Sequence, residues 1–283
     1  VERVYEMGWI FKALTMAAGI DSGAITPATR YFDKGFLVLN TARIENFDGK
    51  GRGDVDMQEV LNKSLNTGAA FVASKMGHDT FRQYMLNYGL GEKTGIDLPD
   101  EIPGLVKNLD STRDIEYATV SFGQGVAVTP IEITRALATL GNGGVLVTPH
   151  LVTEVKYEGG LTKTITPKPP RQVLKPETSA DITRMLVNVV DKSLAGGTVS
   201  LPHYRVAAKT GTAQIANPAG GGYYEDRYLH SFFGYFPAYE PRLIVFLYMG
   251  YPKGAKYASE TFTHPFFNLS KFLISYYEIQ PDR

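Results

Sequence analysis

The stretch "YEMGWIFKALTMAAG", residues 5–19, predicts a short entry followed by a helix whose apolar side chains run almost all the way round it. A helix of that kind is normally buried among other elements. Lys12 stands in the middle of this apolar surface, and Trp9, the only tryptophan of the chain, lies one helical turn before it on the same side. Because a lone lysine on an apolar helix face usually extends toward solvent, this stretch alone does not define a role for Lys12.

Two further short motifs carry groups with which a buried lysine could act. "KSLNTG", residues 63–68, places Ser64 and Asn66 at the junction of two predicted helices, and "KTGT", residues 209–212, ends the first strand of a predicted sheet. Each motif is common by chance and has a simple structural interpretation. Ser64 and Asn66 could cap the helix that follows, and Lys209 could mark an exposed strand end. Their occurrence together, in this order, favours one shared site.

The remaining pattern predicts helices first and an antiparallel sheet afterwards. The first half is typical of helices separated by long polar loops, with Asp56 and Glu59 as a capping pair and Thr129-Pro130 as a helix start. After residue 200, "YRVAAKTGTAQ", "HSFFGYF" and "RLIVFLYMG" have the length and composition of strands. Other helices are expected to begin at Thr67, at Asp79, at Thr178 or Ser179, and near His264-Pro265. This order indicates an α+β fold with an antiparallel sheet flanked by a mostly helical region.

Composition excludes several classes of protein. Acidic and basic residues balance at 29 each, so nothing favours nucleic acid as a partner. Cysteine is absent, which excludes disulfides and thiolate chemistry, and the five histidines have no metal-ligand spacing, so we expect no metal and no other cofactor. The longest apolar run, Leu243–Tyr251, is about half the ~20 residues that span a bilayer. It predicts a buried strand, and the sequence shows no signal peptide or anchor.

Taken together, the helix lysine, Ser64-Leu65-Asn66 and Lys209-Thr210-Gly211 resemble the S-x-x-K, S-x-N and K-T-G motifs of penicillin-binding proteins and serine β-lactamases. "SFGQGVAVTPIEITRALATLGNGG" and "AKYASETFTHPFF" resemble segments of the division-type class B penicillin-binding proteins, which are peptidoglycan transpeptidases. The resemblance implies that residues 1–283 form one transpeptidase domain with a penicillin-binding protein/serine β-lactamase-like fold. Family members also have N-terminal sheet strands, a pedestal domain and a membrane anchor. We expect these to lie outside this sequence and to leave a sheet edge exposed.

The resemblance assigns the chemistry of acyl transfer to particular residues. Transfer from a D-Ala-D-Ala peptide needs a serine nucleophile, a proton acceptor, an oxyanion hole and a grip on the terminal carboxylate. Lys12 corresponds to the proton acceptor, Lys209 to a second cation, and the Ser64 hydroxyl to a relay between them. Burial and the neighbouring ammonium are expected to lower the pKa of Lys12. Asn66 is expected to orient Lys12 or the substrate amide.

The resemblance places the substrate along the strand that carries the K-T-G motif. The hydroxyls of Thr210 and Thr212 would hold the terminal carboxylate, and the backbone N–H of Thr212 would supply half of the oxyanion hole. Gly211 has no side chain, so the peptide backbone could approach the strand closely. The substrate would then lie antiparallel to this strand as an added strand.

Position 9 departs from the family pattern, because Trp9 occupies the place of the nucleophilic serine. Tryptophan has no group that attacks a carbonyl carbon, so the sequence predicts that this chain forms no acyl-enzyme. An indole in place of a serine side chain overfills a packed site unless the ring turns into open space. We therefore predict that Trp9 projects into the substrate cleft and partly blocks it. An introduced substitution, a sequence error and a natural pseudoenzyme are three open explanations of its origin.

Two functions follow from the resemblance. The first is a transpeptidase domain that cross-links stem peptides and is covalently inhibited by β-lactams when serine stands at position 9. The alternative is a catalytically silent homologue that binds peptide or partner proteins in a division complex. A β-lactamase fits less well, because no E-x-x-x-N motif with a deacylating glutamate lies between Asn66 and Lys209.

The same resemblance implies the surroundings of the protein. The expected partners are the peptidoglycan stem peptide, β-lactams and division-complex proteins. The expected location is the extracytoplasmic face of the bacterial inner membrane, with the membrane reached only through an anchor outside these residues.

Overall fold

A three-stranded antiparallel sheet forms much of the C-terminal region in the computed structural model, which describes residues 1–283. Its strands lie in the order β11-β10-β9. They are β9 (Ala207–Ala216), β10 (Tyr223–Phe236) and β11 (Leu243–Gly250). Both β9 and β11 are edge strands of this sheet. The three strands predicted after residue 200 are thereby confirmed, as is the α+β class. The prediction that Leu243–Tyr251 is a buried strand is wrong, because β11 lies at the sheet edge and its residues are half-buried or exposed.

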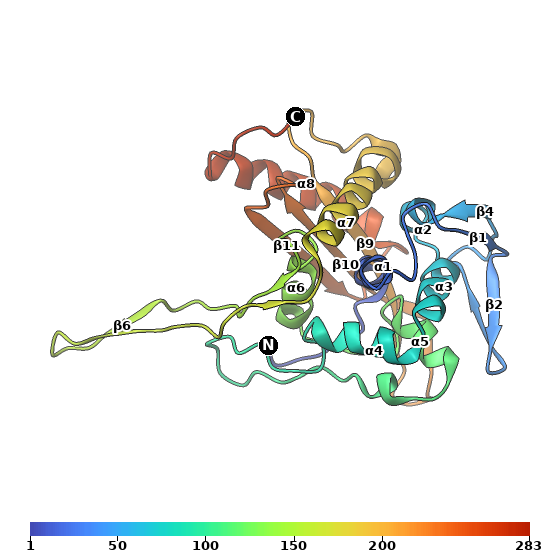
Figure 1. Cartoon of the computed structure of the whole chain (residues 1–283), viewed down its shortest axis with the longest axis horizontal. Helices are drawn as coiled ribbons and strands as arrows, with labels where there is room; N and C mark the ends of the chain where they lie inside the picture. Colours follow the sequence, from blue (N-terminus) through green and yellow to red (C-terminus); the bar gives the residue numbers. More distant parts are fainter.

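The central strand β10 is buried on both faces of the sheet. Phe232 and Phe236 pack in one apolar cluster with helix α8 (Ala258–Tyr276), whereas Phe233 and Tyr235 belong to the larger core of the helical region. Successive side chains of a strand point to opposite faces, so this alternation follows from the sequence "FFGYF". The sheet therefore lies between α8 and the other helices (Figure 1).

Helix α1 (Phe11–Asp21) runs through the centre of the helical region (Figure 1). Every residue of α1 except Ile20 is buried, as its all-round apolar sequence predicts. A single 3-10 turn, η1 (Gly8–Ile10), precedes α1 and carries Trp9, in agreement with the predicted short entry before the helix. The helices in contact with α1 include α3 (Asn66–Met76), α4 (His78–Asn87), α6 (Pro130–Ala138) and α7 (Pro176–Asn188).

The segment between α1 and α3 contains strands that the prediction of long polar loops missed. They are β1 (Arg30–Asp33), β2 (Phe36–Leu39), β3 (Ala42–Glu45) and β4 (Gly53–Asp56). β1 pairs with β4 and β2 pairs with β3, both antiparallel. Four residues are too few for an alternating pattern to be distinguished from a loop, which explains the error.

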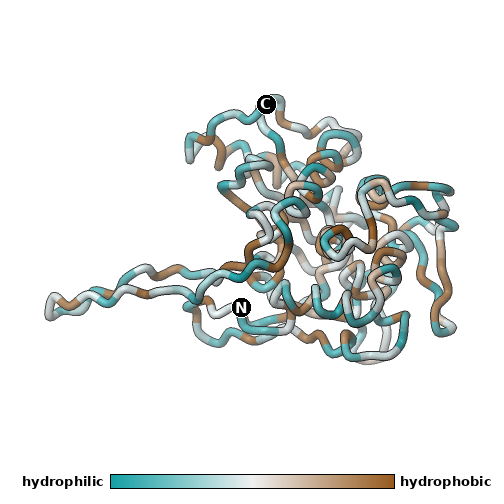
Figure 2. The backbone as a smooth tube through the Cα atoms, in the orientation of Figure 1, coloured by the Kyte–Doolittle hydropathy of each residue, from teal (hydrophilic) through white to brown (hydrophobic).

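A narrow hairpin extends far from the rest of the molecule (Figure 1). It consists of β6 (Glu154–Lys156) and β7 (Thr162–Thr164), all six residues being exposed. Hydrophobic and hydrophilic residues follow one another along it (Figure 2). The two-residue strands β5 (Val145–Leu146) and β8 (Arg171–Gln172) pair with each other.

Two predicted helix starts are confirmed by their hydrogen bonds. The Asp56 side chain accepts a bond from the Glu59 backbone N–H at 2.9 Å, and Thr129 forms a capping box with Glu132 at the start of α6. The helices not yet named are α2 (Met57–Asn62), η2 (Lys107–Asp110), α5 (Asp114–Val120), the π turn η3 (Val189–Ser193) and η4 (Leu194–Gly197). None of the helices combines the length and the apolar character that a membrane-spanning segment requires.

Other predicted helix starts differ from the structure. α3 and α4 each begin one residue earlier than predicted, and α7 begins at Pro176 rather than at Thr178 or Ser179. The largest error concerns α8, which begins at Ala258 and contains Pro265 in its interior. The Glu260 carboxylate accepts the backbone N–H groups of Lys256 and Tyr257, both at 2.9 Å, and this cap sets the helix start.

Candidate active site

Lys12 points into the molecule rather than toward solvent. It lies in the first turn of α1 and is only 1% exposed. Its Nζ donates to the Ser64 carbonyl oxygen and lies 3.1 Å from Ser64 Oγ. Burial, and then the nearby Lys209, lower the pKa of Lys12 well below its ordinary value. The alternative that Lys12 extends toward solvent is therefore wrong.

Ser64 connects Lys12 to the second buried lysine. Its Oγ lies 2.9 Å from Lys209 Nζ, so one hydroxyl contacts both amines. The residue has a left-handed backbone conformation, with φ 54°, in the turn between α2 and α3. The N-cap of α3 is Leu65 and no side chain caps it, so the helix-cap interpretation of Ser64 is wrong. A strained backbone that directs a hydroxyl at two amines suits a functional site.

Lys209 reaches the same point from the sheet. It lies on β9, is 2% exposed, and its Nζ also donates to the Thr210 carbonyl oxygen at 3.2 Å. Burial lowers its pKa from 10.5 to about 7. Near neutral pH this site therefore holds amines that can lose and regain a proton, which general acid–base catalysis requires.

Asn66 begins α3 and lines the larger of two cavities at this site. Its Nδ2 donates to the Glu45 carbonyl oxygen at 2.8 Å. Its Oδ1 is buried and has no hydrogen-bond partner. Asn66 makes no hydrogen bond to Lys12, so of its two predicted tasks only the orientation of a substrate amide fits these contacts.

Gly211 is required by packing within the molecule. A Cβ atom at this position would lie 2.9 Å from the backbone nitrogen of Ile10 and would also collide with Ser231 Oγ. Glycine is thus needed where η1 and β10 pack directly against β9, and its predicted role in the approach of a substrate stays a prediction. Gly8 in η1 is constrained in the same way, with φ 67° and the Thr212 carbonyl 2.6 Å from an added Cβ.

The two threonines of the K-T-G-T motif differ in their surroundings. Thr210 is half-buried and lines the smaller cavity together with Ser64 and Lys209. Thr212 is 3% exposed, and its Oγ1 accepts a hydrogen bond from the Ala258 backbone N–H at 3.1 Å, at the start of α8. β9 is an edge strand, so it can accept an added strand as predicted for the substrate.

Trp9 lies between the two cavities, as the sequence predicted for a ring that enters the cleft. It lines both the larger cavity of about 450 Å³ and the smaller one of about 280 Å³ that contains Lys209. The ring centre lies 4.8 Å from Lys12 Nζ. The indole is thus placed beside the Lys12 amine.

Two aromatic residues that the sequence analysis did not assign to the site meet the indole. The ring centre of Phe47 lies 5.8 Å from that of Trp9, and Tyr257 lies 6.4 Å from Trp9 and 5.5 Å from Phe47. Phe47 was the single aromatic residue of the polar stretch "ENFDGKG", and Tyr257 stood within the quoted segment "AKYASETFTHPFF". An aromatic residue alone in a polar loop was the signal that could have drawn attention to Phe47. No group of His, Cys, Asp or Glu side chains here or elsewhere is arranged to hold a metal ion.

A helix lysine and a strand lysine that share a serine hydroxyl beside an edge strand define the serine acyl-transfer class. The chain belongs to the penicillin-binding protein transpeptidase domain family, whose profile matches residues 1–268. It is 35% identical over 258 residues to stage V sporulation protein D of Bacillus subtilis (strain 168), which covers 90% of this chain and 39% of that protein. It is 28% identical over 273 residues to the peptidoglycan D,D-transpeptidase FtsI of Escherichia coli (strain K12), covering 94% of this chain and 43% of that protein.

Solved structures share the fold. Penicillin-binding protein 3 from Mycobacterium tuberculosis, complexed with aztreonam, superposes with a TM-score of 0.90 at 24% identity, over 100% of this chain and 65% of that chain. The penicillin-binding protein/serine β-lactamase-like fold predicted from the motifs is confirmed. The chain spans only about two fifths of the length of the relatives it matches in sequence.

Proposed function

We propose that residues 1–283 are the transpeptidase domain of a class B peptidoglycan D,D-transpeptidase, and that Trp9 at the nucleophile position makes this chain inactive. The observation that carries the proposal is the Ser64 hydroxyl, which contacts the amines of both Lys12 and Lys209. A structural serine has no reason to be held in a left-handed turn between two buried lysines. This arrangement is suited to moving a proton to and from a nucleophile.

With serine at position 9, Lys12 would take the hydroxyl proton as the oxygen attacks the carbonyl carbon of the penultimate D-Ala. The amide bond to the terminal D-Ala would break, and its nitrogen would receive a proton through Ser64 and Lys209. An amine of a neighbouring stem peptide would then attack the resulting ester, form the cross-link and restore the hydroxyl. A β-lactam would acylate the same serine by opening its ring.

The edge of β9 would bind the donor peptide as an added strand. Thr210 would hold the terminal carboxylate, helped by the positive charge of Lys209 when protonated, and the Thr212 backbone N–H would stabilise the oxyanion. The Thr212 hydroxyl oxygen accepts a bond from the Ala258 N–H, and its own hydrogen would remain free to be donated to the carboxylate. The unpartnered Asn66 Oδ1 would accept a substrate amide N–H.

The family and the similar proteins support a wider setting for this domain. Its substrate would be the stem peptide of peptidoglycan, on the extracytoplasmic side of the bacterial inner membrane, within a protein that also has N-terminal strands, a pedestal and an anchor. Division-complex proteins would be its partners. No cofactor enters the chemistry.

The second candidate is a silent binding homologue, and it is favoured by one observation. Trp9 does not merely replace a nucleophile, because its ring lies against Phe47 and Tyr257 and separates the two cavities. Such an aromatic cluster could hold a peptide side chain without catalysis.

Labelling with a fluorescent penicillin separates the two candidates. We expect no covalent label on the chain as it stands, a label on Trp9→Ser, and none on Trp9→Ala, which opens the same space without a hydroxyl. A folded Trp9→Ser variant that stays unlabelled would contradict the proposed function. The binding candidate would then require that a D-Ala-D-Ala peptide change the fluorescence of Trp9 in the original chain.

A further inference from the structure

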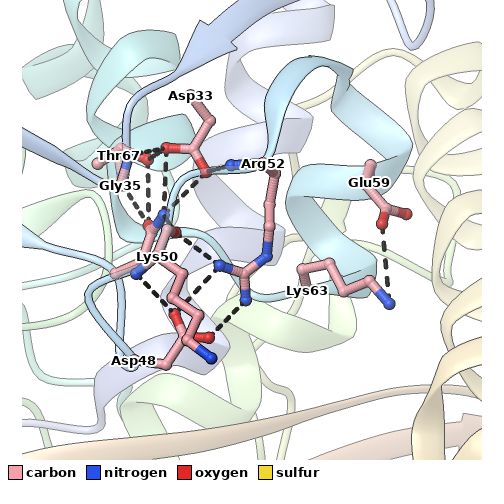
Figure 3. Close-up of polar contacts among 9 residues, drawn as sticks. Asp33, Gly35, Asp48, Lys50, Arg52, Glu59, Lys63 and Thr67 are labelled. Atoms are coloured by element: carbon pink, nitrogen blue, oxygen red, sulfur yellow. Dashed lines mark hydrogen bonds and ion pairs between the residues drawn. The ribbon is translucent and has the colours of Figure 1, made fainter.

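A buried carboxylate lies behind the wall of the cleft, at the end of β1. Asp33 is 1% exposed. Its oxygens accept hydrogen bonds from the backbone N–H of Gly35 at 2.9 Å, the backbone N–H of Arg52 at 3.0 Å and the Thr67 hydroxyl at 2.8 Å (Figure 3). The Asn46 side-chain amide donates to both oxygens, at 3.1 and 2.9 Å. The carboxylate thus joins the end of β1, the loop between β3 and β4 and the first turn of α3.

No cationic group makes a hydrogen bond to this carboxylate. The Arg52 guanidinium extends away from Asp33 (Figure 3) and is bound to the Asp48 carboxylate and the Lys50 carbonyl oxygen. A buried carboxylate held only by neutral donors depends on all of them, because each lost bond leaves an unsatisfied polar group away from water. Because every one of these donors must stay in place, the carboxylate fixes the geometry of the segments that supply them.

Two of these segments are parts of the cleft. Thr67 directly follows Asn66, and Asn46 stands between Glu45, whose carbonyl accepts the Asn66 amide at 2.8 Å, and Phe47, whose ring meets Trp9. The Asn46 Oδ1 also accepts the Thr67 backbone N–H at 3.3 Å. Asp33 therefore holds together the first turn of α3 and the loop that presents Phe47.

We propose that Asp33 is a positioning residue, whose carboxylate fixes both the Phe47 wall of the cleft and the side chain of Asn66. It touches neither the cavity nor the lysines, and it acts through Asn46 and Thr67. The part of the proposal that concerns Asn66 and acylation rests on the proposed function. The part that concerns Phe47 does not, since it is measured in the chain as it stands.

Asp33→Asn is the informative change. The amide has the shape of the carboxylate but turns one acceptor into a donor that faces other donors. The loop that carries Phe47 then loses its hydrogen bonds to residue 33, and Trp9 loses the contact with the Phe47 ring. We expect a red shift of Trp9 fluorescence and easier quenching by acrylamide, at a temperature where far-UV circular dichroism shows the variant to be folded. Asp54 lies on β4, and Asp54→Asn removes only an exposed ion pair with Arg30 of β1, so it should leave both signals unchanged.

A milder variant keeps the test decisive if Asp33→Asn does not fold. Thr67→Val removes one of the bonds to the carboxylate and preserves the shape of the side chain, so it should shift the Trp9 signals in the same direction by less. Unchanged Trp9 emission and quenching in both variants, or in Thr67→Val alone where only that variant folds, would overturn the proposal. A change in thermal stability without a change at Trp9 would show a merely structural aspartate and would also overturn it.

The part of the proposal that concerns Asn66 is tested by the rate of penicillin acylation in the Trp9→Ser background. Misplacement of a group in a reacting site by about 1 Å costs up to about a hundredfold in rate, so we expect Asp33→Asn to slow acylation by about tenfold or more and Asp54→Asn to leave it unchanged. An unchanged rate in Asp33→Asn would overturn the claim that the carboxylate positions Asn66. If Trp9→Ser itself is never acylated, the proposed function fails, and the fluorescence experiment still decides the role of Asp33 at Phe47.

Discussion

The floor and the mouth of the cleft have opposite characters. At the floor, the half-buried Ser64 hydroxyl lies 3.1 Å from the Lys12 amine and 2.9 Å from the Lys209 amine, and both lysines are buried. At the mouth, Trp9, Phe47 and Tyr257 meet ring to ring. On the proposed function, the floor would hold the groups of an acyl-transfer site other than its nucleophile, and Trp9 would stand at the nucleophile position and narrow the mouth.

The largest effect is expected at the floor. In the Trp9→Ser background, Lys12→Met removes the proton acceptor with little change in volume, and a general base typically contributes about a hundredfold to ten-thousandfold. The rate of penicillin acylation should fall by that amount. Lys75→Met, which changes an exposed lysine of α3, should acylate at the rate of the parent. Equal rates in all three chains would remove Lys12 from the mechanism.

The buried lysines should also make the stability of the chain depend on pH. Burial lowers the pKa of Lys209 from 10.5 to about 7, so between these values the unfolded chain binds more protons than the folded one. The free energy of unfolding should therefore rise with pH across this window, by about 1.4 kcal/mol per unit for each such group. This stabilisation is complete above the unfolded pKa and is lost as pH falls toward 7.

Urea unfolding at several pH values within that window measures the slope. Lys209→Met should reduce it, whereas Lys75→Met should not. Lys12, whose pKa is lowered by burial and by Lys209, accounts for part of the remaining slope. A slope that is unaffected by Lys209→Met would mean that this amine stays charged in the folded chain.

The packing of η1 against β9 is expected to give a smaller effect when it is disturbed. Gly211→Ala places a methyl group against Ile10 and Ser231, and overpacking of this kind costs about 1–3 kcal/mol of unfolding free energy. Gly250→Ala is the matched control in the same sheet, since nothing lies within 4 Å of an added Cβ there. Equal midpoints of thermal unfolding for the two variants would refute the close packing of η1 on β9.

The smallest effect belongs to the mouth. Phe47→Ala removes one ring from the cluster, for which we expect a loss of about 0.5–1.5 kcal/mol and a more accessible Trp9. Phe272→Ala, in an exposed ring pair with Tyr276 on α8, should not alter the quenching of Trp9. If Phe47→Ala also leaves the quenching unchanged, the mouth is not closed in solution.

The sequence predicted the floor better than the mouth. Lys12, Ser64 and Lys209 belong to motifs with fixed spacing, and the prediction brought all three to one point. The contacts of Phe47 and Asp33 could not be predicted in this way, because they depend on short strand pairs whose four residues carry no periodic signal. For Gly211 the packing requirement could not be predicted, since its neighbours Ile10 and Ser231 are distant in sequence.

The helix starts show the same limit. Asp56 and Thr129 cap their helices through residues three positions away, so local sequence was sufficient to find them. The predicted start of α8 is too late, because a proline such as Pro265 is usually found in the first turn of a helix. The helix begins at Ala258, where the Glu260 carboxylate forms the cap.

The central claim is that only position 9 separates this chain from an acylating enzyme. Intact mass spectrometry of Trp9→Ser after incubation with a penicillin, followed by mapping of the modified peptide, tests it most directly. We expect one penicillin added per chain of Trp9→Ser, attached to the serine at position 9, and no addition to the original chain. A folded Trp9→Ser that gains no mass, or an addition at any other residue, would contradict it.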